Sequence, residues 1–107
     1  MTICYVDIET EALNKIEGNC TIRTIHSIAI ASEDANPLVF TSRPTHYSDG
    51  SLLDAITIMN NHDIMITHNG IKFDKPVIEQ VLNVKLIAKQ LDTLILSKLV
   101  YTKDALL

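Results

Sequence analysis

The sequence lacks the features that mark membrane and secreted proteins. No apolar run approaches the roughly 18–20 residues that a helix needs to span a bilayer. The first ten residues, MTICYVDIET, carry an acid at position 7 and no basic segment, so we expect no secretory signal. Only two cysteines occur, Cys4 and Cys20, without CxxC spacing, which argues against a disulfide scaffold and a zinc finger. We therefore expect free thiols, a cytoplasmic location and no membrane partner.

The sequence also lacks a surplus of basic residues. Lys and Arg number 9 against 13 Asp and Glu, for a formal net charge of -4. A basic surface that coats nucleic acid by counterion release is thereby excluded. Nucleic acid is not excluded as a substrate, because an acidic enzyme can grip phosphates through metal ions. Its carboxylates repel DNA until the cations arrive.

What is present is the composition of one small globular domain. The 107 residues are 47% hydrophobic and 21% charged, without internal repeats, low-complexity tracts or Pro/Gly/Ser linkers. No Gly-rich phosphate loop of the GxGxxG or GxxxxGK[ST] type occurs. This absence weighs against a nucleotide-binding version of an α/β fold.

Hydrophobic periodicity predicts a strand, a hairpin, and then helices that alternate with strands. The expected strands cover 3–8, 24–31, 37–41, 63–67 and 84–88, and the expected helices cover 51–60, 74–82 and 93–100. The residues expected at the helix N-caps are Ser51 or Asp49, Asp74 and Asp92. This order predicts an α/β fold, a mixed sheet with flanking helices, whose first strand is central and ends at Asp7. The hairpin 24–41 should lie on one side of that strand, and 63–67 on the other side and parallel to it.

Asp7 and Glu9 stand two residues apart at the end of the first apolar strand, so both side chains leave the same face of the sheet. Two carboxylates on one face repel each other unless a cation or protons neutralise them. Oxygen-only ligands in a tight pair suit Mg²⁺ or Mn²⁺ rather than zinc. Alternatively, the two acids only mark the point where a strand meets solvent.

A second candidate group is the segment Asn69-Gly70-Ile71-Lys72-Phe73-Asp74, in which a strand feeds a glycine turn, an aromatic anchor and an acid. Phe73 is expected to pack inward and to fix the direction of Asp74. Alternatively, Asp74 is only an N-cap and Phe73 only a core residue. A third acid, Asp92, is expected to cap the last helix, with a position beside a metal ion as the alternative.

The order and spacing of these segments resemble the proofreading 3′–5′ exonuclease domain of family A DNA polymerases, with the closest likeness to the T7-like phage enzymes. DIETEAL at 7–13 is similar to the first exonuclease motif of that family. HNGIKFDKPVI at 68–78 is similar to the second, of the form Asn-x-x-x-Phe/Tyr-Asp, and LDTLILSKLV at 91–100 to the segment that follows. The resemblance covers nearly the whole chain. It implies a ribonuclease-H-like fold, two divalent metal ions and hydrolysis of a DNA 3′ end.

The resemblance also implies residue roles. Asp7 bridges both metal ions, Glu9 holds the first and helps to orient the attacking water, and Asp74 binds the second. The remaining assignments are substrate contacts by Asn69, Lys72 and Phe73 and a supporting position beside the metals for Asp92. The implied cofactor is Mg²⁺ or Mn²⁺, and the implied partner is a single-stranded DNA 3′ end.

One part of the family pattern is absent. The third exonuclease motif, Tyr-x-x-x-Asp, supplies the remaining ligand of the first metal and a Tyr that positions the water. The 107 residues contain neither this motif nor its His-x-x-x-x-Asp variant, because Tyr101 and Asp104 are three apart, as are His46 and Asp49. We therefore expect residues 1–107 to be the N-terminal part of an exonuclease domain, from a split gene, an interrupted reading frame or a truncation. Its first metal ion should be under-coordinated, and its activity alone weak or absent.

The sequence is also compatible with two other functions. The chain is alternatively a non-catalytic subunit that docks with a separately encoded remainder of a polymerase through its leucine-rich end. A third possibility is an unrelated mixed α/β protein that binds a small molecule. Behaviour as a soluble monomer would argue against the docking subunit. If the protein is of phage origin, its location is the cytoplasm of the host.

Overall fold

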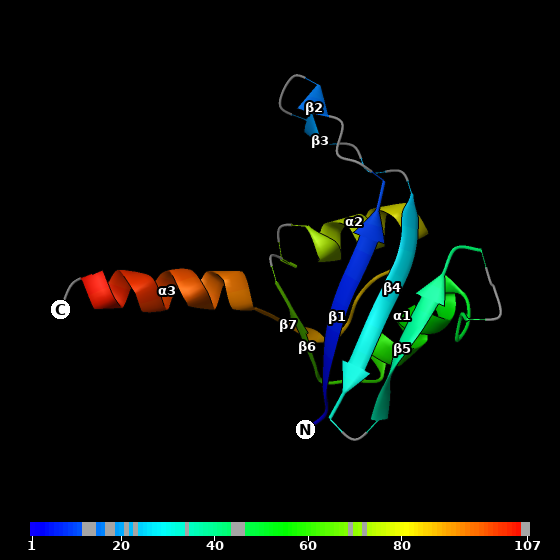
Figure 1. The fold of residues 1–107 in the computed structure, drawn as a ribbon, viewed down its shortest axis with the longest axis horizontal. Coiled ribbons are helices and arrows are strands. Elements are labelled where there is room, and N and C mark those ends of the chain that lie inside the picture. Colours follow the sequence, from blue (N-terminus) through cyan, green and yellow to red (C-terminus); the bar gives the residue numbers. More distant parts are fainter. Residues whose placement is uncertain are drawn as a thin grey trace.

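The computed structural model describes residues 1–11, 15–16, 19–20, 22, 24–33, 35–43, 47–68, 70–71 and 73–105. In chain order, the elements are β1 Ile3–Thr10, β2 Lys15–Ile16, β3 Asn19–Cys20, β4 Ile25–Ser32, β5 Ala35–Thr41, α1 Leu52–Asn60, β6 Ile64–Thr67, α2 Asp74–Leu82, β7 Lys89–Asp92 and α3 Thr93–Ala105 (Figure 1). Across these described ranges, no helix is long and apolar enough to cross a membrane.

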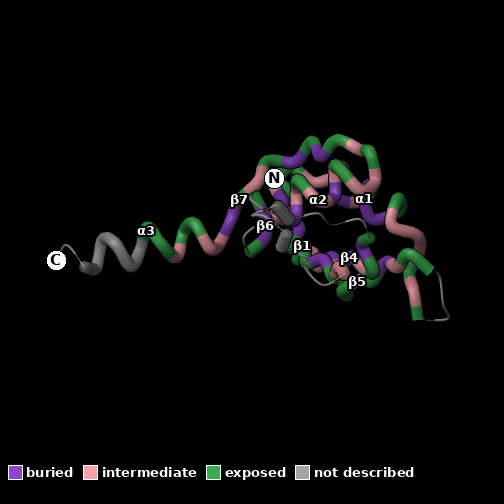
Figure 2. Tube along the Cα trace, turned by 90° about the horizontal axis from the view of Figure 1, so that it is seen from above, coloured by how far each residue is buried: buried purple, intermediate pink, exposed green. Residues whose placement is uncertain are grey.

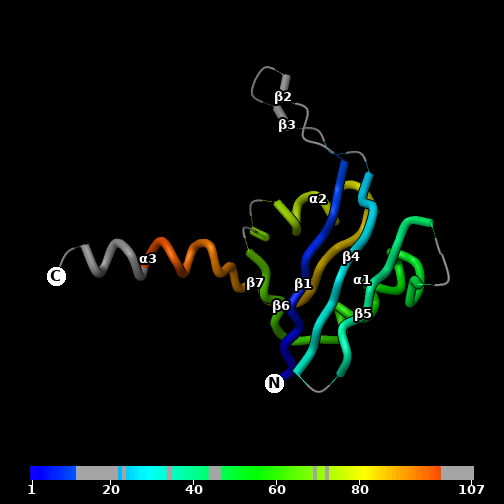
Figure 3. The backbone as a smooth tube through the Cα atoms, viewed as in Figure 1, coloured from blue at the N-terminus to red at the C-terminus, as the bar shows by residue number. Residues whose placement is uncertain are grey.

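One five-stranded sheet organises the fold, with the strand order β5-β4-β1-β6-β7. β1 pairs antiparallel with β4 and parallel with β6, and β7 runs parallel to β6. The hairpin of β4 and β5 therefore lies on one side of the central strand and β6 on the other, as predicted (Figure 3). A separate two-stranded sheet of β2 and β3 was not predicted from the sequence.

Alternation along the strands builds the hydrophobic core on one face of the sheet. Cys4, Val6 and Ile8 of β1 are buried, and the antiparallel register pairs Val6 with Ile30 and Ile8 with Ile28. α1 and α2 cover this face, and Figure 2 shows both helices on the same side of the sheet. The buried side chains that the helices add to the core are Ala55, Ile56, Met59 and Ile78. Burial of each large aliphatic side chain contributes roughly 1.5–3 kcal/mol, so this face supplies most of the stability.

The opposite face of the sheet has no helix packed on it within the described part of the chain (Figure 2). Tyr5 leaves β1 on this side and is 45% exposed, and Leu91 of β7 is 39% exposed. α3 follows β7 without a connecting loop and runs away from the sheet (Figures 1 and 3). Its Leu96 and Leu99 are exposed as well. The sheet therefore presents one open, partly apolar face.

The predicted caps of the first and third helices are confirmed. The Ser51 side chain accepts a hydrogen bond from the Asp54 N–H, and Asp54 Oδ2 accepts one from the Ser51 N–H at 2.9 Å. This reciprocal pair is a capping box. Asp92 Oδ1 accepts a hydrogen bond from Leu94 N at 2.9 Å and so caps α3.

The strand predicted over 84–88 is wrong, because β7 begins only at Lys89. The backbone of the segment before it is held by side chains instead of a neighbouring strand, and Leu86 N donates to Glu79 Oε2 at 3.1 Å. Asn60 Nδ2 donates to the carbonyl oxygen of Lys85 at 3.1 Å, and Asn60 Oδ1 accepts from Ile87 N at 2.9 Å. Leu86 and Ala88 of this connection are buried although Ile87 is exposed, since a connection can bury side chains once its backbone groups are paired.

We expect Asn60→Ala to lower the free energy of unfolding by about 1–3 kcal/mol, because two backbone groups of the 85–87 connection lose their partner. Urea denaturation monitored by circular dichroism measures the change. Asn61→Ala is the matched control, since Asn61 is an exposed neighbour at the helix end and should change stability by less than about 0.5 kcal/mol. Equal losses in the two variants would contradict the assigned role of Asn60.

Candidate active site at the carboxyl ends of the parallel strands

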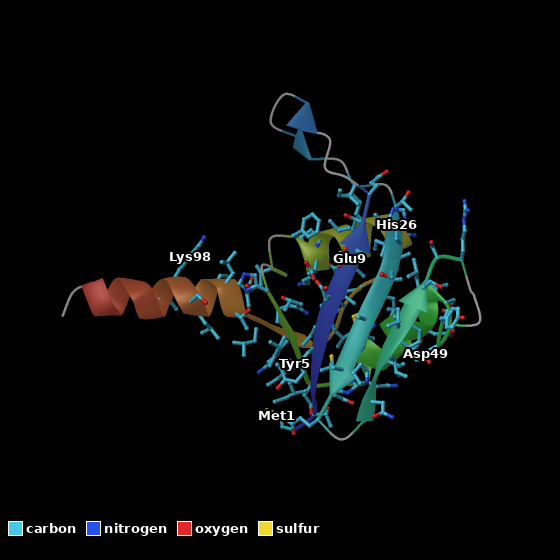
Figure 4. The ribbon with its side chains drawn as sticks, in the orientation of Figure 1. Met1, Tyr5, Glu9, His26, Asp49 and Lys98 are labelled. Atoms are coloured by element: carbon cyan, nitrogen blue, oxygen red, sulfur yellow. The ribbon has the colours of Figure 1, made fainter. Side chains whose placement is uncertain are left out.

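Three parallel strands, β1, β6 and β7, point their carboxyl ends toward the same edge of the sheet. The acids that they carry or lead to are Asp7 and Glu9 on β1, Asp74 at the start of the helix after β6, and Asp92 at the end of β7. Figure 4 shows Glu9 near that end of β1, with Tyr5 closer to the other end. In open α/β sheets, ligands bind at such edges.

Asp7 and Glu9 leave the same face of the sheet, as predicted, and it is the open face, since both are exposed while the residues that alternate with them are buried. The prediction that the strand ends at Asp7 is wrong. β1 continues to Thr10, because its antiparallel pairing with β4 persists and places Asp7 opposite Ala29. The Asp7 carboxylate therefore stands on backbone that is paired on the β4 side, and it is held more firmly than a strand end would hold it.

The turn after β6 is fixed by a close contact at Gly70. A Cβ atom at position 70 would overlap the Thr67 side chain, so only glycine fits there. Lys75 N donates to the Gly70 carbonyl oxygen at 2.8 Å, and Phe73 packs against the hydrophobic core, as predicted. The prediction that Asp74 caps α2 is wrong, because Asp74 is the first helical residue and Phe73 stands at the N-cap position without a side-chain hydrogen bond.

The Asp74 side chain is buried, with 5% of its surface exposed. Loss of solvent raises its pKa from the ordinary 3.8 to about 6, and the negative charges of Asp7 and then of Asp92 act in the same direction. A carboxylate in this position gains from a neighbouring cation or proton. Perturbed pKa values of this kind gather at functional sites.

Asp92 is also buried and holds two segments of backbone. Its Oδ1 atom caps α3 through Leu94 N, and its Oδ2 atom accepts from Ile71 N at 3.2 Å. The second contact joins the turn that precedes Asp74 to the start of α3. Asp92 therefore acts on Asp74 twice, through its charge and through the position of the turn.

A cavity of about 360 Å³ opens on the uncovered face beside Asp7. Its lining includes the apolar residues Tyr5, Ala31 and Ile66 and the polar residues Asp7, His68 and Thr93. His68 Nδ1 lies 2.8 Å from Thr93 Oγ1, and Thr93 Oγ1 donates to the Thr67 carbonyl oxygen at 3.1 Å. Thr93 was missed from the sequence, where only its place directly after Asp92 could have drawn attention to it.

The predicted site residues are brought together in part. Asp7 and Asp92 lie close enough to Asp74 to act on its pKa. Within the described residues, however, no three side chains of His, Cys, Asp or Glu gather closely enough to hold a metal ion together. Asn69 and Lys72 lie outside the residues that the structure describes, and the ligand and substrate roles stay predictions.

The chemistry of the candidate ligands nevertheless suits a divalent cation. Every candidate ligand is a carboxylate, and oxygen donors are what Mg²⁺ and Mn²⁺ prefer. Asp74 adds a second indication, because two neighbouring acids disfavour its negative charge. A bound cation would remove this repulsion and draw the carboxylates inward.

The raised pKa predicts a pH-dependent gain from Asp74→Asn. Because the pKa in the folded state lies above the ordinary 3.8, the protonated carboxyl group favours folding, and this contribution is lost as the pH rises from about 4 through about 6. We expect Asp74→Asn to be more stable than the parent at pH 8 by on the order of 2–3 kcal/mol, with the difference vanishing near pH 4. Urea titrations across this range test it, with exposed Glu33→Gln as the control; a pH-independent difference would contradict the prediction.

Comparison with known proteins agrees with this architecture. The model of the RNase H superfamily matches residues 4–105, which is nearly the whole chain. No curated protein matches the sequence. Among solved structures, the family B DNA polymerase from the hyperthermophilic archaeon Pyrobaculum calidifontis is similar with a TM-score of 0.59 and 14% sequence identity.

The structural match covers 87% of this chain and 15% of that polymerase, so the chain spans a small part of its length. At this identity the likeness concerns the fold alone. The mixed five-stranded sheet with its flanking helices confirms the predicted ribonuclease-H-like α/β class. By the match over residues 4–105, the chain belongs to the RNase H superfamily.

Proposed function

We propose that the chain is a 3′–5′ exonuclease module of a DNA polymerase, of the family A, T7-like phage type, and that residues 1–107 are the N-terminal part of that domain. The observation that carries the proposal is the burial of Asp74 at the edge of the sheet near Asp7, whose negative charge helps to raise the pKa of Asp74. These two acids come from sequence motifs 67 residues apart (positions 7 and 74). The fold brings them to one edge of the sheet, where the resemblance requires shared metal ions.

Asp7, Glu9 and Asp74 approach the proposed site from two different elements. Asp7 and Glu9 leave β1 on the open face, where a substrate has access, and Asp74 approaches from α2. In the proposed site, all three carboxylates would hold divalent cations. When bound, such ions supply a hydroxide nucleophile and stabilise charge on the phosphate, so no serine or cysteine nucleophile is required.

The substrate in this proposal is the 3′ end of single-stranded DNA. Asn69, Lys72 and Phe73 precede Asp74 in the second motif and are proposed to contact the strand. Phe73 is partly buried and packs against the hydrophobic core. Asp92 supports the same turn through its hydrogen bond from Ile71 N.

A second candidate function is a non-catalytic subunit that docks with a separately encoded remainder of a polymerase. The exposed apolar side chains of the open face and of α3 favour it, because such groups mark interaction surfaces when they lie together. The residues concerned are Tyr5, Val39, Leu91, Ile95, Leu96 and Leu99. A stable, soluble monomer in size-exclusion chromatography with light scattering would count against this candidate.

We expect the parent chain to bind Mn²⁺ weakly, and more tightly than Mg²⁺, which holds its waters firmly. Asp7→Ala should abolish this binding, because it removes the proposed shared ligand. Isothermal titration calorimetry measures both, with Glu33→Ala, at the exposed turn between β4 and β5, as the matched control. Equal Mn²⁺ binding by the parent and Asp7→Ala would remove Asp7 from the site.

We expect the isolated chain to degrade single-stranded DNA very slowly or not at all. The 107 residues lack the third-motif Asp and Tyr, and loss of one comparable stabilising group costs on the order of 100- to 1,000-fold in rate. A gel assay with a 3′-labelled oligonucleotide and Mn²⁺ tests this, with Asp7→Ala as the control for contaminating nuclease. Robust digestion that depends on Asp7 would show that the site is complete without that motif.

A further inference from the structure

We propose that His68 binds the 3′-terminal hydroxyl group of the DNA strand through its Nε2 atom, with Thr93 as the residue that positions its ring. The inference rests on the proposed exonuclease function and adds to it a contact that recognises the strand end. Four observations carry it: the strand register, the cavity, the pair of contacts at Thr93, and the chemistry of the hydroxyl group.

The end of β6 and the cavity lining place His68 near Asp7. β1 and β6 are parallel, with Tyr5 opposite Ile66, and β6 ends at Thr67. His68 is therefore the first residue beyond β6 and follows Ile66 by two positions, as Asp7 follows Tyr5 on β1. Both residues are exposed, and both line the cavity on the open face. His68 therefore stands next to a proposed metal ligand.

The contacts at Thr93 fix which ring nitrogen of His68 carries the proton. A hydroxyl group has one hydrogen, and Thr93 Oγ1 donates it to the Thr67 carbonyl oxygen. The contact of 2.8 Å between Thr93 Oγ1 and His68 Nδ1 is then satisfied only if Nδ1–H donates to the hydroxyl oxygen. In a neutral imidazole, the other nitrogen, Nε2, is therefore an acceptor.

An acceptor in this position selects a hydrogen-bond donor on the substrate. The oxygens of a phosphodiester are acceptors and offer nothing to a neutral Nε2. The 3′-terminal hydroxyl is a donor, and it is present whatever the terminal base. From its place in the cavity beside Asp7, His68 would bind the group that distinguishes a 3′ end from the interior of the strand.

The cavity suits the rest of a terminal nucleotide. Its volume of about 360 Å³ lies within the roughly 300–1,000 Å³ typical of small-molecule sites. Tyr5, Ala31 and Ile66 supply an apolar wall, and an aromatic ring such as that of Tyr5 stacks on any base. A base against this wall leaves the sugar at the polar end, where His68 and Asp7 lie.

A double-mutant cycle between protein and DNA tests the contact. The dissociation constant of a 5′-labelled tetranucleotide is measured by fluorescence anisotropy in Mn²⁺ at pH 8. One version of the oligonucleotide ends in a 3′-hydroxyl and the other in a 2′,3′-dideoxynucleotide, and gels confirm that both stay intact. For the parent, we expect loss of the hydroxyl to weaken binding about 3- to 10-fold.

His68→Asn should bind both oligonucleotides equally, at the affinity of the parent for the dideoxy strand. Asn keeps a polar atom near the position of Nδ1, so the contact with Thr93 and the melting temperature should be preserved. His68→Gln places an amide near the position of Nε2 and should restore part of the preference for the hydroxyl. Thr93→Val should reduce that preference, because the ring loses its positioning partner.

Additive losses would overturn the inference, since His68 and the hydroxyl group would then act independently. The absence of any preference for the 3′-hydroxyl in the parent would overturn it as well. Asp7→Asn separates this failure from that of the proposed function. If Mn²⁺-dependent binding requires Asp7 but the cycle is additive, only the role of His68 falls. If binding does not depend on Asp7, the exonuclease proposal falls, and the inference with it.

Discussion

The parallel pairing of β1 with β6, and of β6 with β7, decides where every candidate residue lies. Because the three strands run in one direction, the segments that leave their carboxyl ends meet at one edge of the sheet. Asp7, Asp74 and Asp92 are distant in sequence, and this pairing alone brings their charges within reach of one another. The antiparallel hairpin on the other side of β1 holds the central strand and contributes Ala29 and Ala31 to the open face.

The position of Asp74 is unfavourable for folding. Burying Asp74 near two other acids opposes its ionisation, and a fold selected for stability alone would place a neutral side chain there. The surrounding turn compensates with firm support: Gly70 lies against the Thr67 side chain, and Asp92 holds Ile71 N. Support of this kind keeps a buried acid at a fixed place, as a metal or substrate site would require.

The parts of the fold that could be predicted are those that depend on residues close together in the sequence. The hairpin over 24–41 and the caps at Ser51 and Asp92 follow from residue types within a few positions of each other, and the structure confirms them. The strand predicted over 84–88 is wrong because the partners of that backbone are the side chains of Asn60 and Glu79, which no local strand pattern reveals. The same holds for the site, where the motifs pointed to Asp7 and Asp74 but not to the contact between His68 and Thr93.

The two hydrogen bonds of Asp92 connect α3 to the turn that precedes Asp74. One oxygen of the Asp92 carboxylate accepts a hydrogen bond from Leu94 N in the first turn of α3, and the other accepts one from Ile71 N. A small rotation of the helix that keeps both bonds moves Ile71 with it, and Ile71 lies three residues before Asp74. Because α3 projects beyond the sheet, a small rotation of the helix corresponds to a larger displacement at its far end (Figure 1). The orientation of α3 is therefore coupled, through the two hydrogen bonds of Asp92, to the position of the turn that precedes Asp74.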